Sequence, residues 1–296
     1  MSDSIKKTLF ASGHTACAGC GQSLAARLVL EACGPNTIIA NNTGCLEVFS
    51  TKYPESAWCV PWIHSLFENS AAVASGIEAA LKFLGKKQNI NVICQAGDGG
   101  TGDIGMQALS GMWERGHDIL SICYDNEAYE NTGIQRSGLT PYDASTTTSP
   151  AGAQSFGNPR PKKPVPEIAN AHGIVYVAIA SVGYPQDLQK KVKKALSLKG
   201  PKYLQIHVPC PLGWGHATEL TYQIARLAVQ AGLYPLIEYE NGELVSSFKI
   251  TPKPVEEYLK LQRRFRHVLN NPEEIARIQD TANKNINKYN LVVKNN

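Results

Sequence analysis

The amino-acid sequence predicts an α/β protein, with a parallel β-sheet covered by helices on both faces and a mostly helical C-terminal extension. Three observations predict this fold. Apolar runs alternate with helix-like segments up to about residue 210. The runs are continuously apolar, which is typical of strands buried on both faces. From residue 217 the pattern is mostly helical and rich in Lys, Asn and Gln. We therefore expect an α/β domain over residues 1–216 and an extension over residues 217–296 that packs on it or on a partner subunit.

The first predicted elements lie near the N-terminus. Residues 21–33 have apolar side chains at helical spacing, and the Gly-Pro pair that follows is a typical end signal for a helix. Residues 37–41 form a short apolar run that we interpret as a buried strand, which delivers Asn41, Asn42 and Cys45 to its carboxyl end. Residues 67–84 are rich in alanine and other small residues. They predict a helix that packs closely against the sheet.

Two further strands enclose the next predicted helix. Residues 90–96 and residues 118–124 are both apolar runs. The helical segment between them covers about residues 103–115, and the glycine that follows is a typical stop signal. Together they predict one strand–helix–strand unit of a parallel sheet.

The last predicted strands cover residues 174–180 and 202–209, with a Lys-rich helix at 185–199 between them. Residues 136–166 interrupt the alternation, because they are rich in Thr, Ser, Pro, Gly and Ala and have no apolar period. A loop of this length inside a compact domain is usually functional or disordered.

Composition and charge narrow the class of protein. The chain is 43% hydrophobic and 18% charged, and it has no run of 18 apolar residues, so we expect no membrane span. The N-terminus lacks the apolar stretch of a signal peptide, which predicts a cytoplasmic protein with reduced cysteines. Residues 260–296 carry eight Lys/Arg against three Asp/Glu, while the whole chain has a net charge of +4. The remainder is nearly neutral, which argues against nucleic-acid binding.

Two consecutive strand ends carry the first candidate site. Gly97, Asp98, Gly99 and Gly100 follow one predicted strand directly, and Asn126 follows the next. Ligands bind outside the carboxyl ends of parallel strands, and a right-handed crossover would place these two ends side by side. A carboxylate, an amide oxygen, a nearby carbonyl and phosphate oxygens make the octahedral site that Mg²⁺ prefers, and glycines let the backbone approach a diphosphate. The alternative is that each position is only a tight turn. The asparagine at the matching strand end argues against this alternative.

Four cysteines form the second candidate site. Cys17 and Cys20 share a Cys-x-x-Cys turn, Cys45 follows the first strand, and Cys210 follows the last strand between two prolines. Four thiolates suit a tetrahedral zinc ion or a 4Fe–4S cluster, and unligated core cysteines are a third alternative. The spacing does not decide between the two metals. A neighbouring diphosphate cofactor favours the cluster, because zinc is redox-silent.

Several motifs resemble the β subunit of pyruvate:ferredoxin oxidoreductases, which belong to the 2-oxoacid:ferredoxin oxidoreductase family. A Gly-Asp-Gly triplet with 26 residues between it and Asn126 fits the pattern of thiamine diphosphate enzymes. The resemblance extends from about Cys17 to His267, and its most specific segments are residues 44–49, 61–64, 96–101, 123–138 and 209–214. It implies the thiamine diphosphate-binding fold, and within it the domain on the diphosphate side.

The resemblance also implies roles for individual residues. Asp98, Asn126 and the carbonyl of Ala128 would bind Mg²⁺, and Asn131 would face the thiazolium ring and the substrate as the catalytic residue. The loop after residue 136 would border the active site. The 4Fe–4S cluster would be held by Cys17, Cys20, Cys45 and Cys210. The residues expected to contact the thiamine cofactor are Gly44, Cys45, Gly97, Asp98, Gly99, Gly100, Asn126, Ala128 and Asn131.

The implied activity is the oxidative decarboxylation of pyruvate with coenzyme A, giving acetyl-CoA and CO₂, with one-electron transfer to the 4Fe–4S cluster. Thiamine chemistry also requires a glutamate from a second α/β domain, and the sequence predicts only one such sheet. Glu47, Glu68 and Glu78 are the nearest candidates, but two lie on a predicted packing helix and one follows the cysteine loop. The implied partners are an α subunit with the pyrimidine-side domain, γ and δ (ferredoxin-like) subunits or fused equivalents, and ferredoxin. Without them we expect the chain to be inactive.

Two alternatives stay open. Glu130 stands where pyruvate enzymes of this family usually have an uncharged side chain. An acid beside the substrate disfavours an anionic 2-oxoacid unless it is neutralised or turned away, so another substrate, such as oxalate, phenylglyoxylate or a branched-chain acid, is the second hypothesis. The third is a non-catalytic Cys₄ scaffold or electron-transfer subunit in which the Gly-Asp-Gly turn is vestigial.

Overall fold

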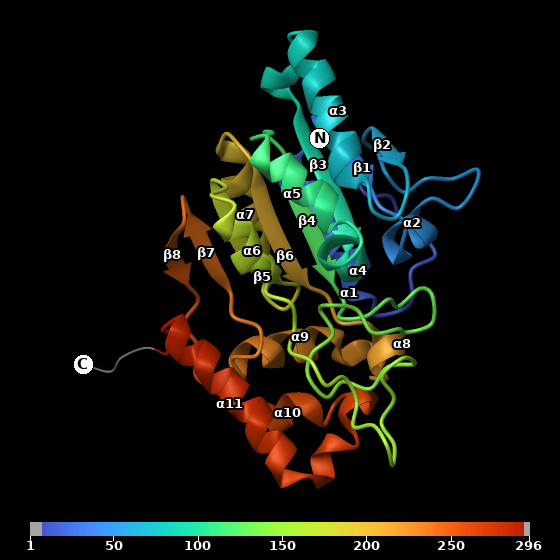
Figure 1. Cartoon of the computed structure of the whole chain (residues 1–296). Helices are drawn as coiled ribbons and strands as arrows, with labels where there is room; N and C mark the ends of the chain where they lie inside the picture. The colour runs from blue at the N-terminus through green and yellow to red at the C-terminus, as the bar shows by residue number, and fades with distance from the viewer. Residues whose placement is uncertain (1–7, 293–296) are drawn as a thin grey trace, which may run out of the picture.

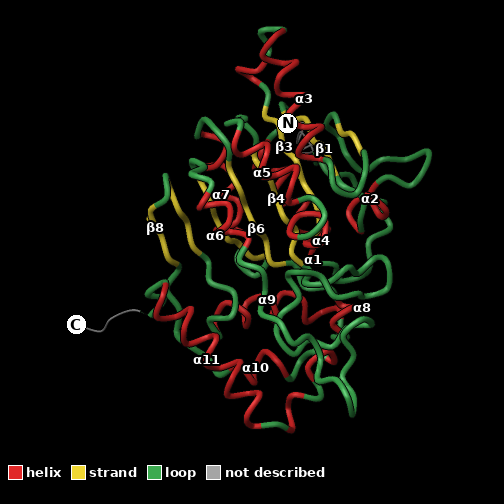
Figure 2. The backbone as a smooth tube through the Cα atoms, in the orientation of Figure 1, coloured by secondary structure: helices red, strands yellow, loops and turns green. Residues whose placement is uncertain are grey.

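The structure is a computed structural model that describes residues 8–292. Within that range one eight-stranded sheet runs through the molecule in the order β2-β1-β3-β4-β6-β5-β7-β8 (Figures 1 and 2). The six strands from β2 to β5 in this order pair in parallel, and β7 and β8 continue the sheet antiparallel. The strands are β1 (Thr37–Asn41), β2 (Trp62–His64), β3 (Asn91–Gly97), β4 (Leu120–Asp125), β5 (Tyr176–Ser181), β6 (Lys202–His207), β7 (Ile237–Glu240) and β8 (Glu243–Ser247).

Helices cover both faces of the parallel strands, as the continuously apolar runs predict. α1 (Gly21–Cys33) and α7 (Pro185–Ser197) share one core with side chains such as Ile93. The neighbouring residues on β3, Val92 and Cys94, belong to a second core on the opposite face. That face is covered by α3 (Ser70–Phe83), α5 (Met106–Glu114) and α6 (Val165–Ala171). Successive strand residues point to opposite faces, so each strand serves both cores.

The predicted helices and strands of the first domain are confirmed with small shifts at their ends. α1 ends where expected, because Gly34 takes a left-handed φ of 77° and its N–H bonds the carbonyl of Leu30. The short helices α2 (Cys45–Ser50), α4 (Asp98–Gly102), α6 and α8 (Pro211–Trp214) and the short strand β2 were not predicted. α4 is built from the sequence Asp-Gly-Gly-Thr-Gly, whose intrinsic helix propensity is low. Its position between β3 and α5, where all five residues are buried, overrides that propensity.

The C-terminal extension lies beyond the carboxyl ends of the parallel strands, as the orange and red helices of Figure 1 show. It is not wholly helical, because β7 and β8 form a hairpin that pairs with β5 in the main sheet. Its helices are α9 (Thr221–Gln230), α10 (Val255–Leu259) and α11 (Pro272–Lys288), with a 3₁₀ turn at Arg263–Phe265, and the short α8 (Pro211–Trp214) precedes the extension. None of the helices within residues 8–292 has the length and apolar character needed to cross a bilayer.

A close backbone contact at Gly105 joins the glycine-rich turn to α5. A β-carbon on Gly105 would lie 2.0 Å from the carbonyl oxygen of Gly100. A Gly105→Ala change therefore forces the backbone apart, and we expect it to lower the free energy of unfolding by about 1–3 kcal/mol. Gly76→Ala is the matched control, since nothing lies within 4 Å of a β-carbon on this glycine of α3. That change should raise helix stability by up to about 1 kcal/mol. Urea unfolding of the full-length variants measures both, and equal effects would contradict the contact.

Candidate functional site

Asp98 and Asn126 lie side by side at the carboxyl ends of two neighbouring strands. β3 ends at Gly97 and β4 at Asp125, and the two strands pair in parallel up to Gly97 and Tyr124. Both side chains are buried, with 2% of Asp98 and 6% of Asn126 exposed. The structure thus brings together the two residues that the sequence placed at adjoining strand ends.

Three oxygen atoms converge between these strand ends. The side-chain oxygen of Asn126 lies 2.9 Å from the carbonyl oxygen of Ala128 and 3.0 Å from Asp98 Oδ1. An amide oxygen that faces two acceptors is satisfied either by turning the amide, so that its nitrogen donates to both, or by a cation among the oxygens. Neighbouring oxygen ligands of Mg²⁺ lie about 2.9–3.0 Å apart when the metal–oxygen bonds are about 2.0–2.1 Å. The donor set therefore fits an octahedral magnesium ion.

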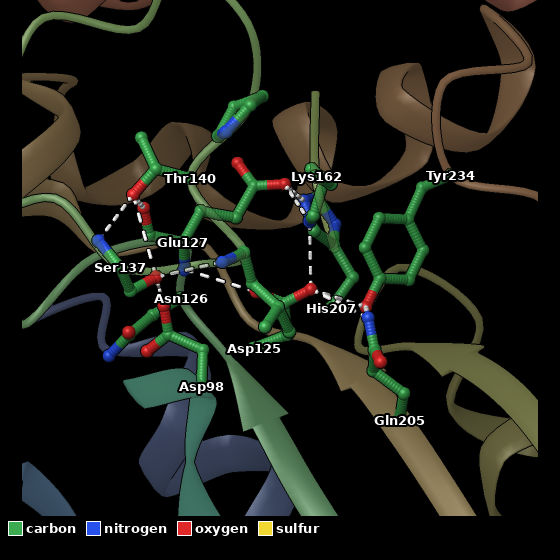
Figure 3. A network of polar contacts seen from close by, with 12 residues as sticks. Asp98, Asp125, Asn126, Glu127, Ser137, Thr140, Lys162, Gln205, His207 and Tyr234 are labelled. Atoms are coloured by element: carbon green, nitrogen blue, oxygen red, sulfur yellow. Dashed lines mark hydrogen bonds and ion pairs between the residues drawn. The ribbon is translucent and has the colours of Figure 1, made fainter. Parts of the chain in front are cut away.

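Hydrogen bonds from the long irregular loop hold this cluster. Ser137 donates from its hydroxyl to Asp98 Oδ2, which leaves Oδ1 to face Asn126. Thr140 donates to the carbonyl oxygen of Glu127 at 2.7 Å (Figure 3). The first part of the predicted loop over residues 136–166 therefore packs directly on the two strand ends.

The electrostatic environment of Asp98 also suits a cation. Burial raises the pKa of its carboxyl group well above the ordinary value, and the nearby charge of Asp125 raises it further. The hydrogen bond from Ser137 offsets part of this effect. A divalent cation beside the carboxylate would stabilise the ionised form that burial disfavours.

The glycine-rich turn is packed so closely that a side chain does not fit. A β-carbon on Gly99 would lie 2.2 Å from the ring of Tyr129. On the other side, Asn42 donates to the carbonyl oxygen of Gly100 at 3.1 Å and accepts from the N–H of Ser70 at 2.7 Å. Asn42 follows β1, so three neighbouring strands contribute to the same site.

The two residues that flank Asn126 in the chain, Asp125 and Glu127, belong to a buried ionic network. Lys162 Nζ lies 2.8 Å from Asp125 Oδ2 and 2.6 Å from Glu127 Oε1 (Figure 3). Arg264, from the extension, places its guanidinium 2.5 Å from Glu127 Oε2. Burial alone would raise the pKa of Glu127, but the charges of Lys162 and Arg264 lower it to about 2. Asp125 also accepts hydrogen bonds from Gln205 and Tyr234.

The four candidate cysteines come from three loops at the same end of the sheet. The N–H of Cys20 donates to the carbonyl of Cys17 at 3.1 Å, and the N–H of Gly21 donates to the carbonyl of Pro209 at 3.2 Å, which joins this turn to the segment before Cys210. Burial raises the pKa of the Cys45 thiol to about 12, with smaller contributions from Glu130, Cys20, Asp98 and Cys17. Cys45 therefore lies within electrostatic range of the other cysteine loops and of Asp98.

The four thiols do not surround a single metal position within the described residues. Among residues 8–292, no three side chains of His, Cys, Asp or Glu form a group that could hold a single metal ion. A tetrahedral zinc ion with bonds of about 2.3 Å would need its sulfurs about 3.8 Å apart. A four-iron cluster is larger than one ion and spreads its cysteine ligands more widely. The four cysteines offer the thiolate donors that both kinds of centre take, but within the described residues they do not form a closed metal site.

Comparisons with known proteins agree with this geometry. Residues 42–206 match the family model of the thiamine pyrophosphate enzyme, C-terminal TPP binding domain. The chain is 56% identical to pyruvate synthase subunit PorB of Methanosarcina barkeri over 98% of this chain and 100% of that protein. It is 51% identical to ketoisovalerate oxidoreductase subunit VorB of Pyrococcus abyssi over 90% and 88% of the two chains. The chain belongs to the β-subunit family of the 2-oxoacid:ferredoxin oxidoreductases.

A solved structure from a 2-oxoacid:ferredoxin oxidoreductase has a similar fold. This is the 2-oxoglutarate:ferredoxin oxidoreductase from Magnetococcus marinus with 2-oxoglutarate, coenzyme A and succinyl-CoA bound. The TM-score is 0.56 at 24% identity, and the match covers 67% of this chain and 65% of that one, just under two thirds of its length. At this identity the likeness shows the fold alone. It confirms the predicted α/β architecture.

Glu130, the acid that the sequence led us to expect beside the substrate, is turned toward the last cysteine loop. A β-carbon on Gly213 would lie 1.7 Å from Glu130 Oε2, so the carboxylate rests against α8 next to Cys210. Its two oxygens are buried and accept no conventional hydrogen bond. Burial raises the pKa of Glu130 to about 7, while the charge of Arg264 and the Cys210 thiol act in the lowering direction. The side chain is therefore both turned aside and partly neutral near pH 7.

The remaining predicted residues differ in what surrounds them. Asn131 is exposed on the turn after Glu130, and Gly44 precedes α2. Among the candidate activating acids, Glu78 pairs with Lys82 and with His117, which precedes β4 at the opposite end of the sheet. Glu78 is therefore excluded as the residue that activates a cofactor at the strand ends.

Sequence reasoning placed Asn42 at the carboxyl end of its strand, but it missed Lys162 and Arg264. Lys162 lies 37 positions from Asp125, and Arg264 lies 137 positions from Glu127, so no local spacing relates them. Arg264 lies in the basic segment over residues 260–296, but its side chain is only 4% exposed. The one available signal was the run Asp-Asn-Glu at the carboxyl end of β4, because a buried acid there needs a buried cation.

Proposed function

We propose that this chain binds thiamine diphosphate, Mg²⁺ and a 4Fe–4S cluster, and that it is the β subunit of an enzyme that oxidatively decarboxylates pyruvate with coenzyme A. The observation that carries the proposal is the convergence of Asp98 Oδ1, the Asn126 side-chain oxygen and the Ala128 carbonyl at the spacing of neighbouring magnesium ligands. Thiamine diphosphate supplies the electron sink for the loss of CO₂ from a 2-oxoacid. The chain's own residues hold and orient it.

Magnesium would connect the protein to the cofactor. Asp98, Asn126 and Ala128 supply three protein oxygens, and diphosphate oxygens and water would complete the coordination. The close packing of Gly99 on Tyr129, and of Gly100 on Asn42, holds the turn that would carry the diphosphate in a fixed conformation. Asn131, exposed beyond this turn, is available to face the thiazolium ring and the substrate.

The cluster would lie next to the cofactor and receive single electrons from it. Cys17, Cys20, Cys45 and Cys210 supply four thiols from loops that are joined by backbone hydrogen bonds. The charge of Asp98 contributes to the raised pKa of the Cys45 thiol, which supports a short separation between the two sites. None of the eight cysteines, all within the described residues, is in a disulfide, which is consistent with a reducing compartment such as the cytoplasm.

Pyruvate is the substrate that the relatives and the position of Glu130 favour. The pyruvate synthase relative covers nearly the whole chain, and the carboxylate of Glu130 rests against α8 and is partly neutral, so it does not present a full charge to an anionic substrate. A branched-chain 2-oxoacid is the second candidate, because a ketoisovalerate oxidoreductase subunit is 51% identical.

The site requires partner subunits. We propose that an α subunit supplies the glutamate that activates the aminopyrimidine ring, and that γ and δ subunits, or their fused equivalents, carry electrons onward to ferredoxin. We further propose that residues 1–216 form the cofactor-binding domain and that residues 217–296 support it, although β7 and β8 also extend its sheet.

Turnover by the assembled complex tests the proposal. The complex would be supplied with coenzyme A, ferredoxin and one of pyruvate, 2-oxoisovalerate, phenylglyoxylate or oxalate, and ferredoxin reduction would be followed spectroscopically. We expect the highest kcat/KM with pyruvate. A higher value with 2-oxoisovalerate would favour the branched-chain candidate. No turnover together with no bound thiamine diphosphate would favour a non-catalytic scaffold and overturn the proposal.

A further inference from the structure

We propose that Arg264, in the C-terminal extension, is a positioning residue for the magnesium–diphosphate site and acts through Glu127 and Trp214. The inference rests on the function proposed above. It gives the extension a role in cofactor binding that its sequence does not indicate, because residues 217–296 contain no motif for metal or phosphate.

The backbone of Glu127 shapes the candidate magnesium site. Glu127 lies between the two residues that offer Asn126 Oδ1 and the Ala128 carbonyl, and its φ is 67°. This is the left-handed region, which a residue with a β-carbon keeps only where its surroundings hold it. The chain turns back at this residue, so that the Ala128 carbonyl lies 2.9 Å from the Asn126 side chain. If Glu127 relaxed to an ordinary conformation, these two oxygens would separate.

Arg264 holds this turn by binding the carboxylate of Glu127. Its guanidinium nitrogen lies 2.5 Å from Glu127 Oε2, and both side chains are only 4% exposed. The other carboxylate oxygen contacts Lys162 at 2.6 Å, but Lys162 is shared with Asp125. Removing Arg264 would therefore leave the buried carboxylates of Asp125 and Glu127 with Lys162 as their shared cation. A buried carboxylate without its own cation is strongly disfavoured, so the side chain of Glu127 would no longer hold the turn.

Arg264 also acts on the other side of the turn, through Trp214. The guanidinium stacks on the Trp214 ring, with 3.6 Å between its central carbon and the ring centroid. The indole N–H of Trp214 donates to the backbone carbonyl of Asn126 at 2.8 Å. One side chain thus fixes Glu127 directly and the residue before it indirectly.

The arginine is itself held rigidly by its own segment. Its Nε donates to Gln262 Oε1 at 2.9 Å, and its terminal nitrogen lies 3.1 Å from the hydroxyl of Tyr258. The backbone carbonyl of Arg264 accepts from the N–H of Ser145 at 2.9 Å, which ties the extension to the long loop. This rigidity is what a residue that positions others requires.

Equilibrium dialysis of thiamine diphosphate against the assembled complex, at increasing Mg²⁺, tests the inference without depending on activity. We expect Arg264→Met to raise the Mg²⁺ concentration for half-saturation by about 10–100-fold, the range typical when an outer partner of a metal ligand is lost. The amount of cofactor bound at saturating Mg²⁺ should stay at the wild-type level. Arg264→Lys, which keeps the charge without the planar stack, should give a smaller shift. The exposed Arg266 supplies the matched control, and Arg266→Met should bind as the wild type does.

Trp214→Phe provides a second variant if Arg264→Met does not fold. It keeps an aromatic ring beneath Arg264 and removes only the N–H that bonds Asn126, so we expect a rise in the same half-saturation value. Unchanged half-saturation in the folded variants, or a loss of bound cofactor that extra Mg²⁺ does not restore, would overturn the positioning role alone. If the wild type itself bound thiamine diphosphate without any dependence on Mg²⁺, the proposed function would fail, and this inference with it.

Discussion

Replacing Asp98 by alanine is expected to abolish magnesium-dependent binding of thiamine diphosphate. Asp98 is the only carboxylate of the three proposed protein ligands, and its Oδ1 faces the Asn126 side chain at 3.0 Å. Losing a direct ligand should lower the affinity for Mg²⁺ by more than the roughly 10–100-fold that the loss of an outer partner causes. Calorimetric titration of the complex with thiamine diphosphate, with and without Mg²⁺, measures the effect.

Asp118→Asn is the matched control for this change, because Asp118 precedes the same strand, β4, at its amino end. Its carboxylate lies 2.5 Å from Lys202 Nζ and 2.9 Å from Lys87 Nζ. Burial would raise its pKa, but these two lysines lower it below the usual range. The neutral variant should therefore lose stability at pH 7, and less so as the pH falls below about 4. Asp118→Asn should leave cofactor binding unaffected. Full retention of thiamine diphosphate by the Asp98→Ala variant would rule out Asp98 as a magnesium ligand.

Replacing Cys45 or Cys210 by serine is expected to remove the cluster held by this chain. A serine hydroxyl is a poor substitute for the thiolate that iron–sulfur clusters require, so about four iron atoms per complex should be lost. Cys59→Ser is the control, since that cysteine is exposed and lies outside the candidate set. Metal analysis and electron paramagnetic resonance of the reduced complex measure the outcome. Unchanged iron in both variants, or zinc in its place, would exclude the cluster.

The juxtaposition of Asp98 and Asn126 was predictable because it follows from the direction of the strands. Each residue comes directly after an apolar run, and the carboxyl ends of parallel strands meet at one edge of the sheet. The same reasoning could not reach Lys162 or Arg264, since a cation that neutralises a buried acid can come from any part of the chain. Their partners, Asp125 and Glu127, are known only once the fold is known.

The hairpin of β7 and β8 was missed although its signal is present. Asn241 and Gly242 both have positive φ, 49° and 90°, as in the two-residue turn that Asn-Gly favours. The flanking strands are only four and five residues long and are largely polar, so their pattern resembled a solvated helix. By contrast, α4 was missed because burial, and not propensity, makes its glycine-rich sequence helical.

A structure of the assembled complex soaked with thiamine diphosphate and Mn²⁺ is the most direct test, since the anomalous signal of manganese locates the metal independently of the surrounding atoms. We expect one peak within about 2.0–2.3 Å of Asp98 Oδ1, the Asn126 side-chain oxygen and the Ala128 carbonyl, with diphosphate oxygens completing the shell. A peak elsewhere, or thiamine diphosphate bound away from the ends of β3 and β4, would contradict the proposed site.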